Sequence, residues 1–491
     1  MTGKSLSDPI KRIVFAEHKY FVDGQWKVSK SGETLSIQSS YLDGEIGRVQ
    51  SMTIEEIDAA IKSAKHAQKS WSKEDMKVRA RLLRAWATQL VADKDEIATT
   101  IMNEVGKTFS DAEKEVLRTA DLINFTVEEF LHMSNESLSA ESYPHGSRNK
   151  FAIIDRVPLG VILAIGPFNY PVNLTVSKIV PALMSGNTVI FKPATRGSIS
   201  GVKLVESFAK VEGFPPGILQ LITGRGNEIG DYMIQHDDIN MITFTGSTRN
   251  GQNISQLAKM TPAVMELGGK DPAIVTANAD LDKTVREIVS GAFGYSGQRC
   301  TAIKRVLVVD EVADELVKRL SEAIAKLKVG TPNDGDVAIV PLINEKAADF
   351  VEDLINDAKK KGAKIIVGGN RDKNLIYPTL IDNVTTQMRF AWEEQFGPVL
   401  PILRVRDVEQ AIKITNDSEY GLQASIFSED FTESIKIARE LEVGSVQING
   451  QPQRGPDSFP FLGAKNSGMG SQGVKNALLS MTREKLTVIN L

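Results

Sequence analysis

One cysteine, Cys300, is the only thiol among 491 residues, and it lies in the stretch GYSGQRCTAIK, residues 294–304. The glycines of this stretch and the polar pair Gln298–Arg299 suit a tight loop that another molecule can approach, and they suit a hydrophobic core poorly. A lone cysteine can equally be a small buried apolar residue. We favour a functional thiol, because the neighbouring residues make a poor core segment. If Cys300 is functional, the fixed positive charge of Arg299 beside it would favour the thiolate.

A carboxylate and a second arginine could act with this thiol. Glu266 lies in the glycine-rich segment MELGGKDP, after a predicted strand. It is either a solvated loop residue or a general base that activates water, if the fold brings it near Cys300. Arg454 lies in the loop NGQPQRGPDSFPF. It and Arg299 are either solvated surface residues or groups that bind an anionic substrate.

The histidines do not offer Cys300 a plausible partner, because none of the five lies in a glycine-rich loop of this kind; they are His18, His66, His132, His145 and His236. A hydrolase that pairs cysteine with histidine is therefore disfavoured. No cluster of residues has the spacing of metal ligands, and we predict no metal site.

The hydrophobic pattern predicts the elements that position these residues. Short strands and turns are expected over 19–50, and a long helical region runs from the capping box at Thr53 to about Met133. Strands and helices alternate from 151 to 266, which indicates a parallel sheet covered by helices. The alternation restarts after residue 272 as a second α/β unit, and the chain ends on a predicted strand.

Two strand ends of the first unit could bind a nucleotide. Lys192 ends the strand of IFKPATRGS, and Gly246 and Ser247 form the strand-to-helix turn of FTGSTRNG. Ligands of α/β folds bind at the carboxyl ends of strands, and backbone N–H groups at such a turn suit a phosphate. Either feature alone could be an ordinary turn, but together they favour a nucleotide site. The six-residue G-x-G-x-x-G fingerprint is absent.

Composition excludes several classes of protein. The net charge of −4 is small for this length, so we expect no nucleic acid and no membrane surface as partner. No apolar run reaches about 18 residues, and the first 20 residues lack an apolar signal region. A single cysteine cannot form an internal disulfide, so the expected compartment is the cytosol.

Seven motifs together resemble the aldehyde dehydrogenase superfamily, from about Tyr20 to the end of the chain. They are PFNYPVNL (167–174), FKPATRGS (191–198), FTGSTRNG (244–251), MELGGKDP (265–272), GQRCTAIKR (297–305), EEQFGPVLP (393–401) and PFLGAKNSGMG (460–470). Within the superfamily the chain most resembles the non-phosphorylating glyceraldehyde-3-phosphate dehydrogenases. That closer match is carried by GAFGYSGQRCTAIKRVLV, TGRGNEIGDY and QRGPDSFPFLGAK.

The resemblance implies a role for each matching residue. Cys300 would be the nucleophile, Asn169 and the Cys300 N–H would hold the oxyanion, and Glu266 would activate the hydrolytic water. Lys192 and Glu394 would bind the cofactor ribose groups. The expected cofactor-binding residues are Pro167, Lys192, Thr195, Arg196, Gly226, Gly230, Thr245, Gly246, Ser247, Leu267, Glu394 and Phe396.

One departure from the common family pattern concerns the cofactor. Members that prefer NAD often carry a glutamate three residues after the lysine of this strand, where it accepts the 2′-hydroxyl of the adenosine ribose. Here that position is Thr195, and Arg196 follows it. A carboxylate would repel a 2′-phosphate, whereas threonine and an arginine tolerate or attract one. We therefore expect NADP as the cofactor, with NAD possible, and Arg196 as a hypothetical phosphate contact.

A second departure concerns the substrate. Many members have an uncharged residue before the cysteine, and here it is Arg299. By resemblance, Arg454, Arg118 and Tyr170 would join it around one pocket that suits a dianion. The expected reaction is oxidation of D-glyceraldehyde 3-phosphate to 3-phosphoglycerate with NADP and water, without inorganic phosphate. The alternatives are another short anionic aldehyde (sulfolactaldehyde or succinate semialdehyde), a cysteine thioester hydrolase, and a non-catalytic scaffold.

The resemblance also implies the architecture. We expect an α/β aldehyde dehydrogenase-like fold with two doubly wound parallel-sheet domains and a small β arm for oligomerisation, in a homotetramer. The expected boundaries are 1–139 and 158–265 for the nucleotide-binding domain, 266–450 for the catalytic domain, and 140–157 with 466–491 for the arm.

Overall fold

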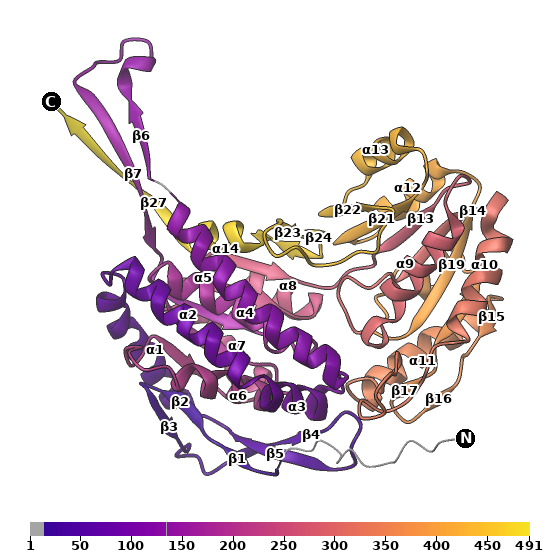
Figure 1. Cartoon of the computed structure of the whole chain (residues 1–491), viewed down its shortest axis with the longest axis horizontal. Coiled ribbons are helices and arrows are strands. Elements are labelled where there is room, and N and C mark those ends of the chain that lie inside the picture. The colour runs from indigo at the N-terminus through magenta and orange to yellow at the C-terminus, as the bar shows by residue number, and fades with distance from the viewer. Residues whose placement is uncertain (1–13, 134) are drawn as a thin grey trace.

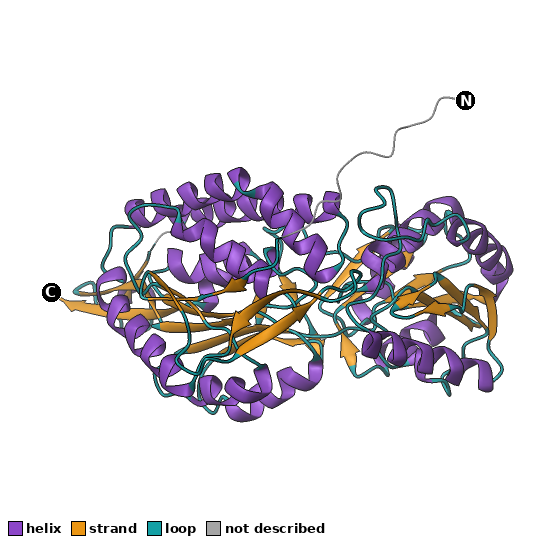
Figure 2. Cartoon of the chain, turned by 90° about the horizontal axis from the view of Figure 1, so that it is seen from below, coloured by secondary structure: helices purple, strands orange, loops and turns teal. Residues whose placement is uncertain are grey.

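The computed structural model describes residues 14–133 and 135–491. The predicted lack of a signal region and the predicted start of the first domain fall partly on residues 1–13, which lie outside the described residues. Two α/β bodies lie side by side, and a β arm extends from the first of them with the C-terminus at its tip (Figure 1). In each body the sheet lies between layers of helices (Figure 2).

The long helical region after Thr53 forms four helices: α1 (Ile54–Trp71), α2 (Met76–Ala92), α3 (Lys94–Val105) and α4 (Phe109–His132). The predicted capping box is confirmed, since the Thr53 side chain accepts from the Glu56 N–H and the Glu56 side chain accepts from the Thr53 N–H. Trp71, Trp86 and Ile123 on the apolar faces of these helices are fully buried. Helices α2, α3 and α4 belong to one hydrophobic core cluster, whereas most buried residues of α1 belong to another.

The first sheet has eight strands among the described residues. In spatial order they are β25 (Gly468–Met469), β12 (Ala263–Glu266), β11 (Met241–Thr245), β8 (Val161–Ile165), β9 (Thr188–Lys192), β10 (Leu219–Leu221), β2 (Tyr20–Val22) and β3 (Gln25–Lys27). The central strands from β12 to β10 are parallel, as predicted, but β25, β2 and β3 pair antiparallel at the two edges. The connecting helices are α5 (Asn173–Met184), α6 (Ser198–Ala209), α7 (Gly226–Gln235) and α8 (Thr248–Leu257).

The second sheet has seven strands among the described residues: β15 (Lys364–Val367), β18 (Thr379–Asp382), β19 (Val399–Val405), β14 (Arg305–Val309), β13 (Pro272–Val275), β21 (Gln423–Phe427) and β22 (Ser445–Ile448). All neighbours are parallel except the edge pair β15–β18. Its helices are α9 (Leu281–Phe293), α10 (Asp310–Ile324), α11 (Glu345–Lys360), α12 (Val408–Asn416) and α13 (Phe431–Glu440). The predicted second α/β unit is therefore confirmed, with a mixed edge.

The arm is an antiparallel sheet of β6 (Glu136–Ser139), β7 (Lys150–Pro158) and β27 (Thr482–Asn490). Strand β27 pairs with β7 along its whole length, from Thr482 opposite Pro158 to Asn490 opposite Lys150. Leu138, Leu486 and Val488 are exposed on this sheet. Between the first body and the arm lies α14 (Val474–Ser480). The domain boundaries themselves stay a prediction.

Smaller elements complete the described residues. A sheet of β1 (Glu17–His18), β5 (Glu45–Gln50) and β4 (Thr34–Gln38) covers one side of the first body. Short pairs are β16 (Arg371–Asp372) with β17 (Leu375–Ile376), β20 (Tyr420–Gly421) with β24 (Ala464–Lys465), and β23 (Phe461–Leu462) with β26 (Ser471–Gln472). Three short 3₁₀ helices are η1 (Ala140–Ser142), η2 (Gly294–Gly297) and η3 (Arg389–Ala391).

Candidate active site

The turn that carries Cys300 follows α9 and η2 and is held by long-range hydrogen bonds. Tyr295 and Ser296 have positive φ angles of 51° and 54°, which is unfavourable backbone for residues other than glycine. The Tyr295 hydroxyl donates to the Val105 carbonyl at 2.7 Å, and the Ser296 hydroxyl donates to the Val340 carbonyl at 2.8 Å. These bonds keep the strained backbone in place and present a half-buried Cys300 at the end of the turn.

The electrostatic surroundings of the thiol differ from the sequence-based interpretation. Burial raises the pKa of Cys300 to about 12, Lys304 opposes this, and the carboxylates of Glu266 and Asp271 add to it. The Arg299 guanidinium instead donates to the Ser290 carbonyl at 3.2 Å and the Gly291 carbonyl at 2.6 Å, near the end of α9. The cation that most favours the thiolate is therefore Lys304, and not the arginine beside it in sequence.

Glu266 is the last residue of β12, and it is buried with two cations. Its carboxylate accepts from the Thr245 hydroxyl at 2.7 Å and from the Arg454 guanidinium, and the Lys178 Nζ lies 3.6 Å from its Oε2. Burial alone would raise the pKa of Glu266, but Arg454 and Lys178 together hold it below its ordinary value. Glu266 is thus ionised at neutral pH, as a general base must be.

Asn169 lies against the Cys300 turn. Its Nδ2 donates to the Gln298 carbonyl at 3.0 Å, and the second N–H of the same amide is left for another acceptor. The loop that carries it is fixed from α4, because the Glu115 carboxylate accepts from the N–H groups of Val172 and Asn173 at 3.0 Å each. The structure therefore brings Asn169, Glu266 and Cys300 to one place from three separate segments.

Tyr170, the neighbour of Asn169, is held by a buried cation. The Lys107 ammonium lies 3.7 Å from the centre of the Tyr170 ring and 5.0 Å from that of Tyr295. Glu115 forms an ion pair with Lys107 in this buried position. The cation thus links the loop of Asn169 to the turn of Cys300.

The loop from Gly450 to Ser458 brings two of the predicted substrate arginines, Arg118 and Arg454, into contact. Arg118 makes a bidentate ion pair with Asp457, at 3.0 and 2.8 Å, and donates to the Arg454 carbonyl at 2.6 Å. Gln451 of the same loop donates to the Ser290 hydroxyl at 3.0 Å, beside the carbonyls that bind Arg299.

Each of these guanidinium groups already has a partner within the protein. The Arg454 guanidinium bonds Glu266 and donates to the Gln472 side chain at 2.9 Å, and it lies 5.0 Å from the Phe461 ring centre. Arg118 is paired with Asp457, and Arg299 with backbone carbonyls. A guanidinium has five N–H groups, so an anionic substrate would bind the donors that remain or displace these partners.

On the other side of Cys300, the first sheet offers groups that fit a dinucleotide. Lys192 ends β9 and is buried, its Nζ donates to the Pro193 carbonyl at 3.1 Å, and burial lowers its pKa to about 8. Ser247 is the N-cap of α8, so the free N–H groups of that helix face the edge where β11 ends. A methyl group on Gly226 or Gly230 would meet nothing within 4 Å, so space is open there.

The remaining predicted cofactor residues lie around this space. Glu394 accepts from the Gly269 N–H at 3.1 Å and lies 3.4 Å from Lys304 Nζ. Half-buried Phe396 packs against Phe168, the neighbour of Pro167, with ring centres 6.0 Å apart. Leu267 is buried, and its N–H donates to the Ser467 carbonyl at 2.9 Å. The donor and acceptor types at this edge suit ribose hydroxyls and phosphates.

Thr195 and Arg196 follow Lys192 in a half-buried turn. The Arg196 guanidinium donates to the Ile343 carbonyl at 2.5 Å, so it ties this turn to the loop before α11. Thr195 places no carboxylate at the position where one would oppose a 2′-phosphate.

Sequence reasoning missed several charged partners of the site. Lys178 is the only charged residue of the apolar helix α5, it is fully buried, and its ammonium has no hydrogen-bond partner among the described residues. Burial lowers its pKa to about 8. A charge in an otherwise apolar helix could have flagged it. No comparable sequence pattern marks Lys304 or Asp457, because the contacts of these residues form only when the chain folds.

Comparison with known proteins agrees with this geometry. A family model described as the aldehyde dehydrogenase family matches residues 26–487. The chain belongs to the aldehyde dehydrogenase family. The predicted resemblance and the predicted α/β fold are thereby confirmed.

Individual members of the family are similar over nearly the whole chain. The NADP-dependent glyceraldehyde-3-phosphate dehydrogenase of Streptococcus equinus is 51% identical over 475 residues, which are 97% of this chain and 99% of the relative. A crystal structure of an NADP-dependent glyceraldehyde-3-phosphate dehydrogenase from Bacillus halodurans C-125, complexed with NADP, matches with a TM-score of 0.95 and 53% identity over 97% of this chain and 99% of that one. A 3-sulfolactaldehyde dehydrogenase of Priestia aryabhattai is 36% identical over 97% of this chain and 98% of the relative.

No described helix is both long and apolar enough to cross a membrane.

Proposed function

We propose that this chain oxidises D-glyceraldehyde 3-phosphate to 3-phosphoglycerate with NADP and water, without inorganic phosphate. Support comes from the similarity to NADP-dependent glyceraldehyde-3-phosphate dehydrogenases over nearly the full length. The observation that carries the proposal is the position of Arg454, whose guanidinium bonds Glu266 while its backbone carbonyl binds Arg118. The loop proposed to bind the substrate phosphate and the proposed general base thus meet at Arg454.

The chemistry follows from the three residues that the fold brings together. The Cys300 sulfur adds to the aldehyde carbon, and the Asn169 amide and the Cys300 N–H hold the negative charge that develops on oxygen. NADP, when bound, supplies the oxidising power by accepting a hydride from that carbon. Cys300 then carries a thioester, which is cleaved by a water molecule from which Glu266 removes a proton. The products are the carboxylate, the free thiol, NADPH and two protons.

The ion pair between Arg454 and Glu266 gives the substrate phosphate a second role. While the pair is intact, Arg454 helps to keep the pKa of Glu266 low, and such a carboxylate is a weak base. A phosphate that draws Arg454 away would raise this pKa towards the range of an effective general base. The anion would then both anchor the substrate and prepare Glu266 for hydrolysis.

NADP would be held at the edge of the first sheet. Lys192 and Glu394 would bind ribose hydroxyls, and Gly246, Ser247 and the N–H groups of α8 would bind the pyrophosphate. Thr195 would leave room for the 2′-phosphate. Because Arg196 is bonded to Ile343, its contact with that phosphate would need one of its remaining N–H groups.

Another short anionic aldehyde is the second candidate substrate. Arginines that bind a phosphate also bind a sulfonate or a carboxylate, and a relative named for 3-sulfolactaldehyde shares 36% of its residues with this chain. The greater similarity to the phosphate-named relatives favours glyceraldehyde 3-phosphate. The thioester hydrolase and the scaffold are disfavoured by the family and by the complete set of Cys300, Glu266 and Asn169.

The homotetramer and the cytosolic compartment stay predictions. The exposed apolar residues of the arm, Leu138, Leu486 and Val488, suit a neighbouring copy of the chain.

The test is the absorbance of NADPH when the protein is mixed with glyceraldehyde 3-phosphate and NADP in buffer without phosphate. We expect turnover that exceeds turnover with NAD and disappears in Cys300→Ser. Turnover only with sulfolactaldehyde or succinate semialdehyde would show that glyceraldehyde 3-phosphate is not the substrate. Turnover by Cys300→Ser would refute the mechanism.

A further inference from the structure

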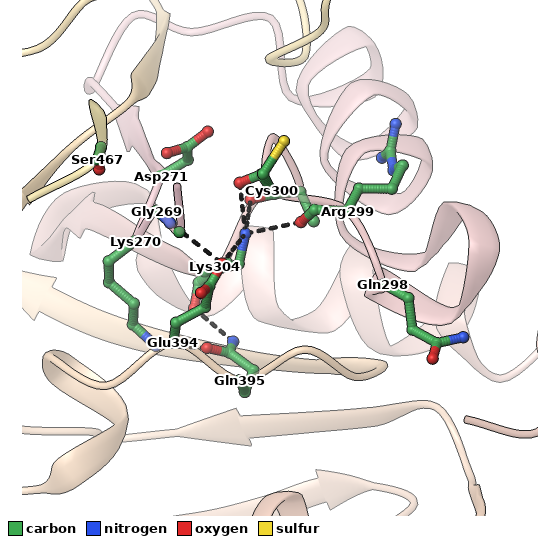
Figure 3. A network of polar contacts seen from close by, with 12 residues as sticks. Gly269, Lys270, Asp271, Gln298, Arg299, Cys300, Lys304, Glu394, Gln395 and Ser467 are labelled. Carbon is green, nitrogen blue, oxygen red and sulfur yellow. Dashed lines mark hydrogen bonds and ion pairs between the residues drawn. The ribbon is translucent and has the colours of Figure 1, made fainter. Parts of the chain in front are cut away.

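Lys304 is a fully buried lysine whose ammonium points back to the turn of the nucleophile. Its Nζ donates to the Arg299 carbonyl at 2.9 Å and to the Cys300 carbonyl at 2.6 Å, and its side chain is 1% exposed. In Figure 3 the dashed lines from this ammonium run to the backbone of both residues and to Glu394. The backbone of Lys304 is itself fixed, because its N–H donates to the Asp271 carbonyl at 2.9 Å and its carbonyl accepts from Gln395 at 2.7 Å.

The bond to Arg299 acts on a group that the reaction uses. The Arg299 carbonyl and the Cys300 N–H belong to one planar trans peptide, so the two point in opposite directions. An ammonium that holds the carbonyl on one side therefore fixes the direction of the N–H on the other. It also polarises the peptide, which makes the N–H a stronger donor to an oxyanion.

The charge of Lys304 acts on the sulfur as well. The groups that face the thiol electrostatically include the carboxylates of Glu266, Asp271 and Glu394, all of which disfavour a thiolate, and Lys304, which favours it. Lys178 also interacts with Cys300, but its own charge is opposed by burial and shared with Glu266. Arg299 directs its guanidinium to the end of α9.

We propose that Lys304 is a positioning residue for Cys300, whose ammonium orients the oxyanion-binding N–H, stabilises the thiolate and ties both to the cofactor site through Glu394. This inference rests on the proposal that Cys300 is the nucleophile. The link to Glu394 follows from the 3.4 Å between Lys304 Nζ and Glu394 Oε1. One cation thus connects the nucleophile with a residue proposed to hold the cofactor ribose.

The first measurement is the rate at which iodoacetamide alkylates the protein at pH 8.5, without aldehyde or cofactor. Cys300 is the only cysteine, so the rate reports on this thiol alone. In Lys304→Met the rate should fall about tenfold, which corresponds to a rise of one pKa unit. The matched control is Lys270→Met, since Lys270 is as buried but donates to the Glu393 carbonyl and to Gln395, and not to the Cys300 turn. Its rate should stay within about twofold of the parent.

The second measurement separates orientation from charge in the complete enzyme. Lys304→Gln keeps an N–H donor for the Arg299 carbonyl but has no charge, so it should recover part of the kcat lost in Lys304→Met without recovering the alkylation rate. KM for NADP should rise in both variants because Glu394 loses its cation, whereas KM for the aldehyde should change little. Lys304→Gln also serves if the Met variant does not fold, which thermal unfolding would reveal.

An unchanged alkylation rate in Lys304→Met, or an equal fall in Lys270→Met, would overturn the inference. A fall confined to the Lys304 variants supports it, even if another aldehyde proves to be the substrate. Turnover by Cys300→Ser would instead refute the role of Cys300, which the alkylation rates do not test.

Discussion

The nucleotide side and the substrate side of this site differ in which parts of the fold hold their polar groups. On the nucleotide side, Lys192 and the N-terminus of α8 stand at strand ends, beside space that glycines leave open. On the substrate side, the guanidinium groups of Arg118, Arg299 and Arg454 are bonded to protein acceptors. The nucleotide side is built mainly from strand and helix ends of the first sheet, whereas the substrate side depends on side chains held by contacts between distant segments.

The largest expected effect comes from Arg454→Gln, which removes the guanidinium that Glu266 and the substrate would share. We expect kcat/KM for glyceraldehyde 3-phosphate to fall on the order of 30- to 100-fold, because a hydrogen bond to a charged group is lost. For uncharged glyceraldehyde the fall should be at most about fivefold. Steady-state NADPH formation with both aldehydes measures the difference.

The matched control is Arg404→Gln, because Arg404 of β19 is paired with Asp382 of β18 and with Asp314 of α10, away from the site. A further experiment adds phosphite to the reaction with glyceraldehyde. If the anion draws Arg454 from Glu266, phosphite should accelerate the parent and leave Arg454→Gln unchanged. Equal losses with the charged and the uncharged aldehyde would show that the arginine does not bind the phosphate.

On the nucleotide side, Thr195→Glu should shift cofactor choice. A carboxylate at this position would repel the 2′-phosphate, so the ratio of kcat/KM with NADP to that with NAD should fall about tenfold or more. Glutamine is nearly the same size as glutamate but carries no charge. Thr195→Gln should therefore leave the ratio of kcat/KM with NADP to that with NAD close to that of the parent. If both variants behave alike, size and not charge determines the preference.

A smaller effect is expected from Asp457→Asn, which removes the charged partner of Arg118. The ion pair is partly exposed, so its loss should raise KM for glyceraldehyde 3-phosphate about three- to fivefold by freeing the guanidinium to move. KM for NADP should not change. A lower KM for the aldehyde would mean that Asp457 competes with the substrate for Arg118 and does not orient it.

The smallest expected effect concerns the pH dependence of stability, and the group responsible is Asp271 in the segment MELGGKDP. Burial raises the pKa of Asp271 to about 7, above the value of about 4 for an unfolded chain. The folded protein therefore binds this proton more tightly, and the stability it contributes is lost as pH rises from 4 through 7. Asp271→Asn keeps the acceptor for the Gln423 N–H and removes the titration.

The thermal midpoint should accordingly fall less between pH 5.5 and pH 8 in Asp271→Asn than in the parent protein. Differential scanning calorimetry at the two pH values gives the comparison. The same pH dependence in both proteins would show that Asp271 is not the group responsible.

Much of the nucleotide side was predictable because its signals are local. The strand ending at Lys192 and the turn at Gly246 and Ser247 follow from hydrophobic periodicity and turn chemistry, and both lie where the sequence placed them. The antiparallel edge strands were not predicted, since strand direction at an edge depends on which distant segment pairs there. Strand β25 joins β12 from about two hundred residues further along the chain.

The sequence by itself determined the two α/β units, the family and the lone thiol in a glycine-rich turn, because these depend on residue type and short-range pattern. Only the tertiary structure decided which cation each anion meets. Arg454 and Glu266 are 188 residues apart, and Arg118 and Asp457 are 339 apart. The path of the backbone after Cys300 places the Lys304 ammonium, and not the Arg299 guanidinium, where it favours the thiolate. Ion pairs form over a few ångströms in space, and no spacing along the chain records those distances.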